Sequence, residues 1–188
     1  MNKKKMISII AIAILIVLAS CYRYEKINKN IATVYEKQQY HIDENIDLDD
    51  LKFSIKSYKI NEYKKDDNVD VVLKLNIKNI SNKTIDASSL VTNSKLATYF
   101  NYQDYGNISE QDYKSIKNLL PNSEANVTLT YSVLSSTMDN LKNNLEFQFY
   151  ISNELYQNQI TQKYKNGILY SKYVYLGNKS ITWKSYIS

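Results

Sequence analysis

The chain has 188 residues, with one cysteine, one histidine, three glycines and one proline, and a formal net charge of +5. A single cysteine excludes an intramolecular disulfide, so a hydrophobic core has to stabilise the fold. Three of the 24 basic residues lie within the first five positions, and without them the basic residues nearly balance the 19 acidic ones. Net charge therefore gives no argument for nucleic-acid binding.

The first 21 residues are typical of an export signal. Three lysines at positions 3–5 precede an apolar run over 6–19 that contains one polar residue, Ser8, and Ser20 and Cys21 follow. A basic start, an apolar centre and small residues before a cleavage point are the three parts of a secretory signal. The sequence therefore predicts that the rest of the chain faces outward from the cell membrane.

The segment Leu18–Cys21 resembles the lipobox of bacterial lipoproteins. This resemblance implies that the thiol of Cys21 takes a diacylglycerol and that a peptidase cuts the chain before it. The alternative is an uncleaved transmembrane helix. As a helix, residues 6–22 would span roughly 25 Å, whereas a bilayer core of about 30 Å usually takes about 20 residues. We expect a lipid anchor, with a single N-terminal transmembrane helix as the alternative.

Polar residues dominate positions 22–48, which predicts a tether with a short extended piece over 42–48. Beyond it, apolar and polar residues alternate with a period of two, which marks half-buried strands. Alternation predicts strands over 51–55, 69–77, 127–133 and 145–151. Residues 84–106 fit either short strands or a long crossing loop, and a last short strand is expected over 181–187.

A helix of about three turns is predicted over 109–120. Ser109 and Asp112 resemble a capping box, in which the serine oxygen accepts an early backbone N–H of the helix. Pro121 follows, and the residue before a proline resists helical geometry.

The segment from 160 to 176 predicts a hairpin around Asn166 and Gly167, because this dipeptide tolerates the positive φ angles of a type I′ turn. Aromatic residues and lysines alternate along it, and no acidic residue follows Glu154. This pattern predicts a possible binding surface, which consists of Lys163, Lys165, Tyr170, Lys172 and Tyr173. The structural alternative is a sheet edge whose lysines prevent aggregation and whose tyrosines pack on the core.

About seven strands and one helix predict a mainly β fold, an immunoglobulin-like β-sandwich with one short inserted helix behind the N-terminal signal or anchor. The segments Leu75–Ser81 and Leu119–Ser123 are similar to those of small Gram-positive surface lipoproteins with an immunoglobulin-like domain of unknown function. This resemblance covers roughly residues 51–151 and implies a fold rather than an activity. The expected organisation is a signal or anchor over 1–21, a tether over 22–48 and a sandwich domain over 49–188.

Catalytic patterns are not found in the sequence. Nucleophilic catalysis needs a base beside the nucleophile, but His41 lies in the predicted tether and Cys21 in the signal. The acids Asp104, Glu110 and Asp112 are better explained as surface charges than as a carboxylate pair.

Alternating oxygen side chains over 43–49 hint at a calcium loop, but the glycine and the closing glutamate of such a loop are missing. A solvated acidic tether explains this pattern better. We therefore expect no enzymatic activity, no cofactor and no metal.

The sequence favours a binding module of the bacterial cell envelope that contacts the membrane through its anchor and another envelope protein or a peptide through its sandwich. Nucleic acid is an unfavoured ligand because the domain is expected outside the membrane. One alternative is a self-protection lipoprotein that shields its cell from a bacteriocin or phage, and a second is a small-ligand receptor.

Overall fold

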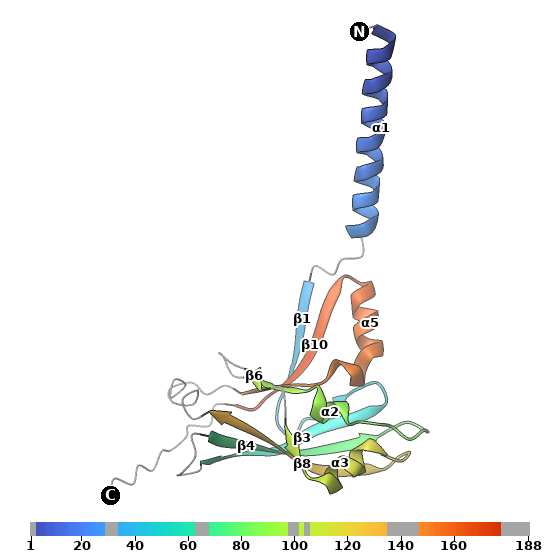
Figure 1. Cartoon of the computed structure of the whole chain (residues 1–188). Helices are drawn as coiled ribbons and strands as arrows, with labels where there is room; N and C mark the ends of the chain where they lie inside the picture. Colours follow the sequence, from blue (N-terminus) through green and yellow to red (C-terminus); the bar gives the residue numbers. More distant parts are fainter. Residues whose placement is uncertain are drawn as a thin grey trace, which may run out of the picture.

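The structure, a computed structural model, describes residues 3–28, 34–62, 68–97, 102–103, 106–134 and 147–177. Within these residues the fold is mainly β, with two five-stranded sheets and helices at their periphery (Figure 1). The strands are β1 (Val34–Tyr40), β2 (Ile46–Asp47), β3 (Leu51–Glu62), β4 (Asn68–Asn79), β5 (Lys95–Ala97), β6 (Tyr102–Gln103), β7 (Asn107–Ile108), β8 (Glu124–Leu134), β9 (Gln148–Tyr150) and β10 (Ile168–Tyr175). The helices are α1 (Lys3–Asn28), α2 (Ser89–Thr92), α3 (Glu110–Lys117), the 3₁₀ helix η1 (Asn153–Tyr156) and α5 (Gln157–Lys165).

The first sheet has the strand order β1-β10-β9-β5-β6, and the second has the order β2-β3-β4-β8-β7. Among the described strands, β1 runs parallel to β10, while the other neighbouring pairs are antiparallel. The prediction of a mainly β sandwich is therefore confirmed.

Apolar side chains at every second position of the strands form the core between the two sheets. In β4 every second residue from Val69 to Ile77 is buried, and β8 shows the same alternation. The rings of Phe53 in β3 and Phe149 in β9 stack with centroids 5.9 Å apart, and Tyr131 of β8 meets Phe149 edge-on at 6.3 Å. These contacts join opposite sheets, as expected when one face of each strand is apolar.

The predicted inserted helix is present as α3. The side chain of Ser109 accepts a hydrogen bond from the backbone N–H of Asp112 at 3.1 Å, which caps the first turn. The carboxylate of Asp112 also accepts the backbone N–H of Thr128 at 3.1 Å. Asp112 thus attaches α3 to β8, and Figure 1 shows the helix beside that strand.

Part of the predicted tether is sheet. Residues 34–40 form β1, paired in parallel with β10, and residues 46–47 form β2, within the extended piece predicted over 42–48. The sequence Val34–Tyr40 shows no apolar alternation, because β1 lies at the end of its sheet and only Tyr40 is buried. An edge strand with exposed side chains needs no hydrophobic pattern, so its composition resembles that of a linker.

The predicted hairpin over 160–176 is wrong, because residues 157–165 are helical and only β10 is a strand. Gly167 has a φ of 75°, and its N–H donates to the carbonyl oxygen of Tyr164 at 2.9 Å. Glycine in the left-handed region is the usual residue after the last turn of a helix. The Asn-Gly pair therefore ends α5 rather than turning a hairpin.

The helix α1 includes Cys21, and Figure 1 shows it apart from the two sheets. Its described apolar side chains, such as Leu15 and Val17, are exposed. No helix of the described residues has the length and mean hydropathy of a membrane span. The predicted strand over 181–187 lies outside the described residues.

Candidate functional site

The five residues predicted as one binding surface do not lie together on an exposed surface. Lys163 and Lys165 belong to α5, whereas Tyr170, Lys172 and Tyr173 belong to β10. Successive residues of a strand point to opposite faces, so Tyr173 lies opposite the other two. Tyr170 is 7% exposed and Lys172 only 3% exposed, which places both in the interior.

Lys172 occupies a cage of aromatic rings beneath α5. Its Nζ lies 5.4 Å from the ring centroid of Tyr156, 5.8 Å from that of Tyr40 and 5.9 Å from that of Tyr170. A cation within about 6 Å of an aromatic face is attracted by the ring quadrupole. The same Nζ donates a hydrogen bond to the backbone carbonyl oxygen of Asp47. Lys172 is therefore a structural residue.

Burial shifts the pKa values of this cluster. It lowers the pKa of the Lys172 ammonium, and the carboxylates of Asp47 and Asp49 act against that shift. Burial raises the pKa of Tyr156 to about 12, although the hydrogen bond that its oxygen accepts from the backbone N–H of Lys172 acts in the opposite direction. Burial also raises the pKa of Tyr170. The tyrosines stay neutral, and a low dielectric surrounds the ammonium.

Lys163 lies at the rim of the cage. Its Nζ is 2.8 Å from a carboxylate oxygen of Glu36 in β1 and 5.1 Å from the ring centroid of Tyr170. Lys165 is exposed at the end of α5. The ion pair attaches the helix to the edge strand. Lys165 is exposed and Lys163 and Tyr173 are partly exposed, but Tyr173 lies on the other face of the sheet.

The opposite, outer face of the first sheet carries a second group of lysines and tyrosines. Lys37 of β1 donates to the hydroxyl of Tyr150 in β9 at 3.3 Å. Its Nζ lies 5.3 Å from the ring centroid of Tyr35 and 5.6 Å from that of Tyr150. Tyr35 also shares a 3.2 Å hydrogen bond with Ser171 of β10. Three neighbouring strands thus present a polar, aromatic surface away from the core.

A pocket of about 370 Å³ opens on this face. The sheet supplies Tyr35, Lys37 and Tyr150 to its wall, and Lys95 comes from β5. Ser152, which precedes η1, and Glu154 of η1 close the other side. This volume falls in the range of ligand sites, about 300–1,000 Å³. The pocket is therefore the candidate functional site.

Ser152 is an unusual member of the pocket wall. Its backbone N–H donates to Ser94 Oγ at 2.9 Å, but its own Oγ is buried and makes no hydrogen bond. Buried hydroxyl groups in folded proteins nearly always have a partner. The Ser152 hydroxyl is thus a polar group for which the protein itself supplies no partner.

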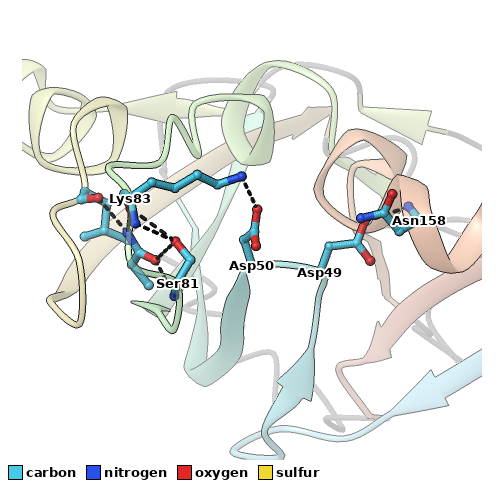
Figure 2. Close-up of polar contacts among 7 residues, drawn as sticks. Asp49, Asp50, Ser81, Lys83 and Asn158 are labelled. Carbon is cyan, nitrogen blue, oxygen red and sulfur yellow. Dashed lines mark hydrogen bonds and ion pairs between the residues drawn. The ribbon is translucent and has the colours of Figure 1, made fainter.

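A second hollow, of about 260 Å³, contains four acids, but each already has a protein partner. Figure 2 shows that Asp49 accepts the backbone N–H of Asn158 and that Asp50 pairs with Lys83. The remaining acids, Asp86 and Glu154, accept hydrogen bonds from Ser88 and Asn93 respectively. These acids stabilise turns and the start of α5, so this hollow is a structural feature.

Asp43 and Asp47 of the predicted tether each lie close to a lysine. Asp43 pairs with Lys56 at 2.7 Å, and Asp47 lies 3.8 Å from Lys52, so the acids of the predicted tether diverge. No group of three or more histidine, cysteine, aspartate or glutamate side chains in the described ranges is arranged to hold a metal ion. His41 is exposed.

Comparison with known proteins gives a fold but no family. No protein-family model matches the chain, and no curated protein matches it. An uncharacterised β-sandwich protein from Clostridium difficile 630 matches 76% of this chain and 96% of its own, with 11% identity and a TM-score of 0.51. The yjhA protein from Bacillus subtilis matches 73% of this chain and 99% of its own, with 12% identity and a TM-score of 0.46. At such identities, the likeness to the first protein shows a β-sandwich fold.

Sequence reasoning missed the pocket because its residues come from four separate segments. Lys37 and Tyr35 lie in the stretch that resembles a tether, and Lys95 lies in a region without a clear pattern. Tyr150 did carry a signal, since it occupies the polar side of an alternating strand.

Proposed function

We propose that this protein is a binding module of the bacterial cell envelope, anchored to the outer face of the cell membrane, and that its binding site is the pocket on the outer face of the first sheet. The observation that carries this proposal is the pocket itself, with Lys37 and Lys95 beside Tyr35 and Tyr150. Lysines and aromatic rings on a concave surface supply charge, hydrogen bonds and contact area for recognition. This replaces the hairpin as the proposed binding surface.

Strand order supports the finer proposal that the sandwich is immunoglobulin-like. The neighbours β3-β4-β8-β7 follow one another as the A, B, E and D strands of that fold do, and β5-β9-β10 as the C, F and G strands do. The inserted helix α3 then lies in the D–E connection. The additional strand β1 extends the G edge by parallel pairing.

The anchor proposal places the lipid on Cys21. The cysteine is exposed on α1, and the apolar side chains around it, Leu18 among them, are exposed as well. An exposed apolar helix is costly in water and favourable in contact with lipid. Anchoring raises the effective concentration of the module near its partner, so a modest interface would suffice.

The partner that fits best is a segment of another envelope protein or a peptide, since the pocket is open and its wall combines aromatic rings with polar and charged side chains. A second candidate, a small-ligand receptor, is favoured by the volume of the pocket. The two differ in what crosslinks to the pocket wall: a protein adds a large mass, and a small ligand does not.

Photo-crosslinking in intact cells tests the proposal. A photoreactive residue replaces Tyr35 in the pocket wall, and the matched control replaces Lys74, an exposed residue on the second sheet. We expect a discrete protein adduct at position 35 and none at position 74. Equal labelling at both positions, or no adduct from a chain shown to be on the cell surface, would contradict the assignment of the pocket.

The variant Cys21→Ser tests the anchor. We expect it to lose the lipid and to leave the membrane fraction, as measured by mass spectrometry and cell fractionation. A chain that keeps its membrane association and an unprocessed N-terminus would instead favour the single transmembrane helix.

A further inference from the structure

Exposed apolar side chains gather at one end of the first sheet. Seven large apolar side chains are exposed in the described residues after α1, and three of them, Ile80, Leu120 and Leu134, adjoin β4 or β8 in the second sheet. The other four are between 46% and 58% exposed: Val34, Tyr35, Tyr164 and Leu169. An exposed group of this kind often marks a contact with a partner or a membrane. We call these four residues, together with Lys165, the tip.

Backbone hydrogen bonds bring the tip together from three elements. The N–H of Val34, the first residue of β1, donates to the carbonyl oxygen of Gly167 at 3.2 Å. The N–H of Gly167 donates in turn to the carbonyl oxygen of Tyr164 in the last turn of α5 at 2.9 Å. Tyr35 lies opposite Leu169 in the parallel pairing of β1 with β10. The start of β1, the end of α5 and the start of β10 therefore form one small surface.

The tip is the end of the domain that follows the anchor. Because β1 begins at Val34, only residues 22–33 connect it to Cys21, whereas the sequence predicted a tether over 22–48. The helix α1 continues to Asn28 and rises about 1.5 Å per residue, and each later step to β1 adds at most about 3.5 Å. The connection therefore holds the tip within roughly 30 Å of Cys21. Figure 1 shows α1 approaching the domain from this end.

The uncharged side chains of the tip suit the interface between a membrane and water. Tyrosine has an apolar ring and a polar end, and it is enriched where lipid headgroups meet water. The hydroxyl of Tyr35 shares a hydrogen bond with Ser171, so this polar end is satisfied while the ring stays exposed. Val34 and Leu169 add aliphatic surface. Contact with lipid would remove this apolar surface from water, which is favourable.

The charges near the tip point to the same partner. The ammonium of Lys163 is 2.8 Å from the carboxylate of Glu36, so these two charges balance. Lys165 is exposed in the last turn of α5 and adds one positive charge. On α1, residues 23–26 carry two basic side chains and one acidic side chain. Basic side chains close to a bilayer are attracted to its anionic lipids, so this small positive excess favours a membrane surface.

We propose that the tip rests on the lipid headgroups of the membrane that holds the anchor, with Tyr164 and Leu169 in the interface. This inference rests on the proposed anchoring at the outer face of the membrane, and it holds for a lipid anchor as well as for a transmembrane helix. Because β1 and β10 both run away from the tip, the first sheet stands upright on the membrane. The pocket on its outer face then opens sideways, toward partners in the same membrane.

Photo-crosslinking to lipid tests the inference on the full-length chain, held by its anchor in vesicles of phosphatidylcholine and phosphatidylglycerol. A photoreactive residue replaces Leu169 in the tip, and the matched control replaces Leu120, an exposed leucine beside the second sheet. We expect about fivefold more lipid adduct at position 169 than at position 120, because only a side chain in the interface meets lipid. Equal labelling, or a crosslink between two copies of the chain at position 169, would reject the membrane contact.

Variants separate the apolar contribution from the charged one. With the photoreactive residue at position 34, Leu169→Ser should lower the yield of lipid adduct about two- to fivefold, and the matched control Leu120→Ser should leave it unchanged. Lys165→Gln should lower the yield in vesicles with phosphatidylglycerol but not in phosphatidylcholine alone. Lys74→Gln, an exposed lysine on the second sheet, is its control. Thermal unfolding checks that each variant keeps the fold, and unchanged yields in folded Leu169→Ser would contradict the proposal.

These results are separable from a failure of the proposed function. A chain that stays in the vesicles without lipid adduct at position 169 retains the anchor and rejects the tip. A chain that leaves the vesicles rejects the anchor and this inference with it. Lipid adducts at position 169, in a protein whose pocket captures no partner in cells, retain the tip and reject the binding module. A protein adduct in place of lipid at position 169 in cells would assign the tip to a partner protein and overturn the inference.

Discussion

The side-chain ammonium of Lys172 donates a hydrogen bond to the backbone carbonyl oxygen of Asp47, 125 positions earlier in the chain. This bond joins β10 of the first sheet to β2 of the second. Three tyrosine rings surround the ammonium within 5.9 Å. A lysine that a sequence pattern places on a binding surface is thus a link between the two layers of the sandwich.

Removal of the Lys172 side chain should destabilise the fold. We expect Lys172→Ala to lower the free energy of unfolding by about 2–4 kcal/mol, because it leaves a cavity among the rings and an unpaired carbonyl oxygen. Lys172→Met keeps the stem and loses the ammonium, so its cost should stay below about 2 kcal/mol. Urea unfolding of the full-length chain measures both. Equal stability of Lys172→Ala and the parent chain would refute the structural role.

Alkaline pH should destabilise the protein through Tyr156. Burial raises its folded pKa to about 12 from the ordinary value of 10.0. Between these values the unfolded chain releases the proton that the folded chain keeps, so the stabilisation is present below pH 10 and lost toward pH 12. The loss from this group should be at most about 2–3 kcal/mol.

Lys172 acts in the opposite sense. Burial lowers the pKa of Lys172 in the folded chain, so its charged side chain opposes folding at lower pH. The free energy of unfolding therefore rises with pH until the lysine of the unfolded chain also loses its proton near 10.5. Urea midpoints across this range should therefore rise gently and then fall. The variant Tyr156→Phe should show a flatter decline above pH 10, and an unchanged slope would argue against Tyr156 as its cause.

Gly106 should not tolerate a side chain. A Cβ atom at this position would lie 2.4 Å from Leu129 Cδ1 and 2.8 Å from Leu129 Cγ. Leu129 is fully buried, so its side chain would have to shift within a close-packed core to make room. We expect Gly106→Ala to cost about 1–3 kcal/mol by overpacking. A melting temperature within error of the parent chain would show that the core adapts at this point.

Asp49 should stabilise the start of α5. Its carboxylate accepts the backbone N–H of Asn158 at 2.6 Å (Figure 2), which satisfies one of the donors that a helix leaves open at its first turn. We expect Asp49→Ala to cost about 1 kcal/mol and Asp49→Asn less, because an amide oxygen can still accept the bond. Chemical unfolding measures the difference between the two variants, and a larger loss for the asparagine would contradict capping.

The sequence determined those parts of this protein whose signal is local. Alternation with a period of two located β3, β4 and β8, because one face of each strand is apolar and the other is not. The pair Ser109 and Asp112 located the start of α3, since a cap joins residues three positions apart. The predictions failed where the same residues serve two structures: Asn166 and Gly167 suit a hairpin turn as well as the end of a helix, and the polar stretch over 34–40 suits a tether as well as an edge strand.

Only the tertiary structure decided the candidate site. Whether Lys172 is buried and Lys37 exposed depends on which strand pairs with which, and β1 meets β10 more than 130 positions away. The pocket needs Lys37, Lys95, Tyr150 and Ser152 together, and these residues lie on segments with no local relation to one another. A local pattern encodes which side of a strand is apolar, but a binding site that is assembled from distant strands exists only once the sheets have closed.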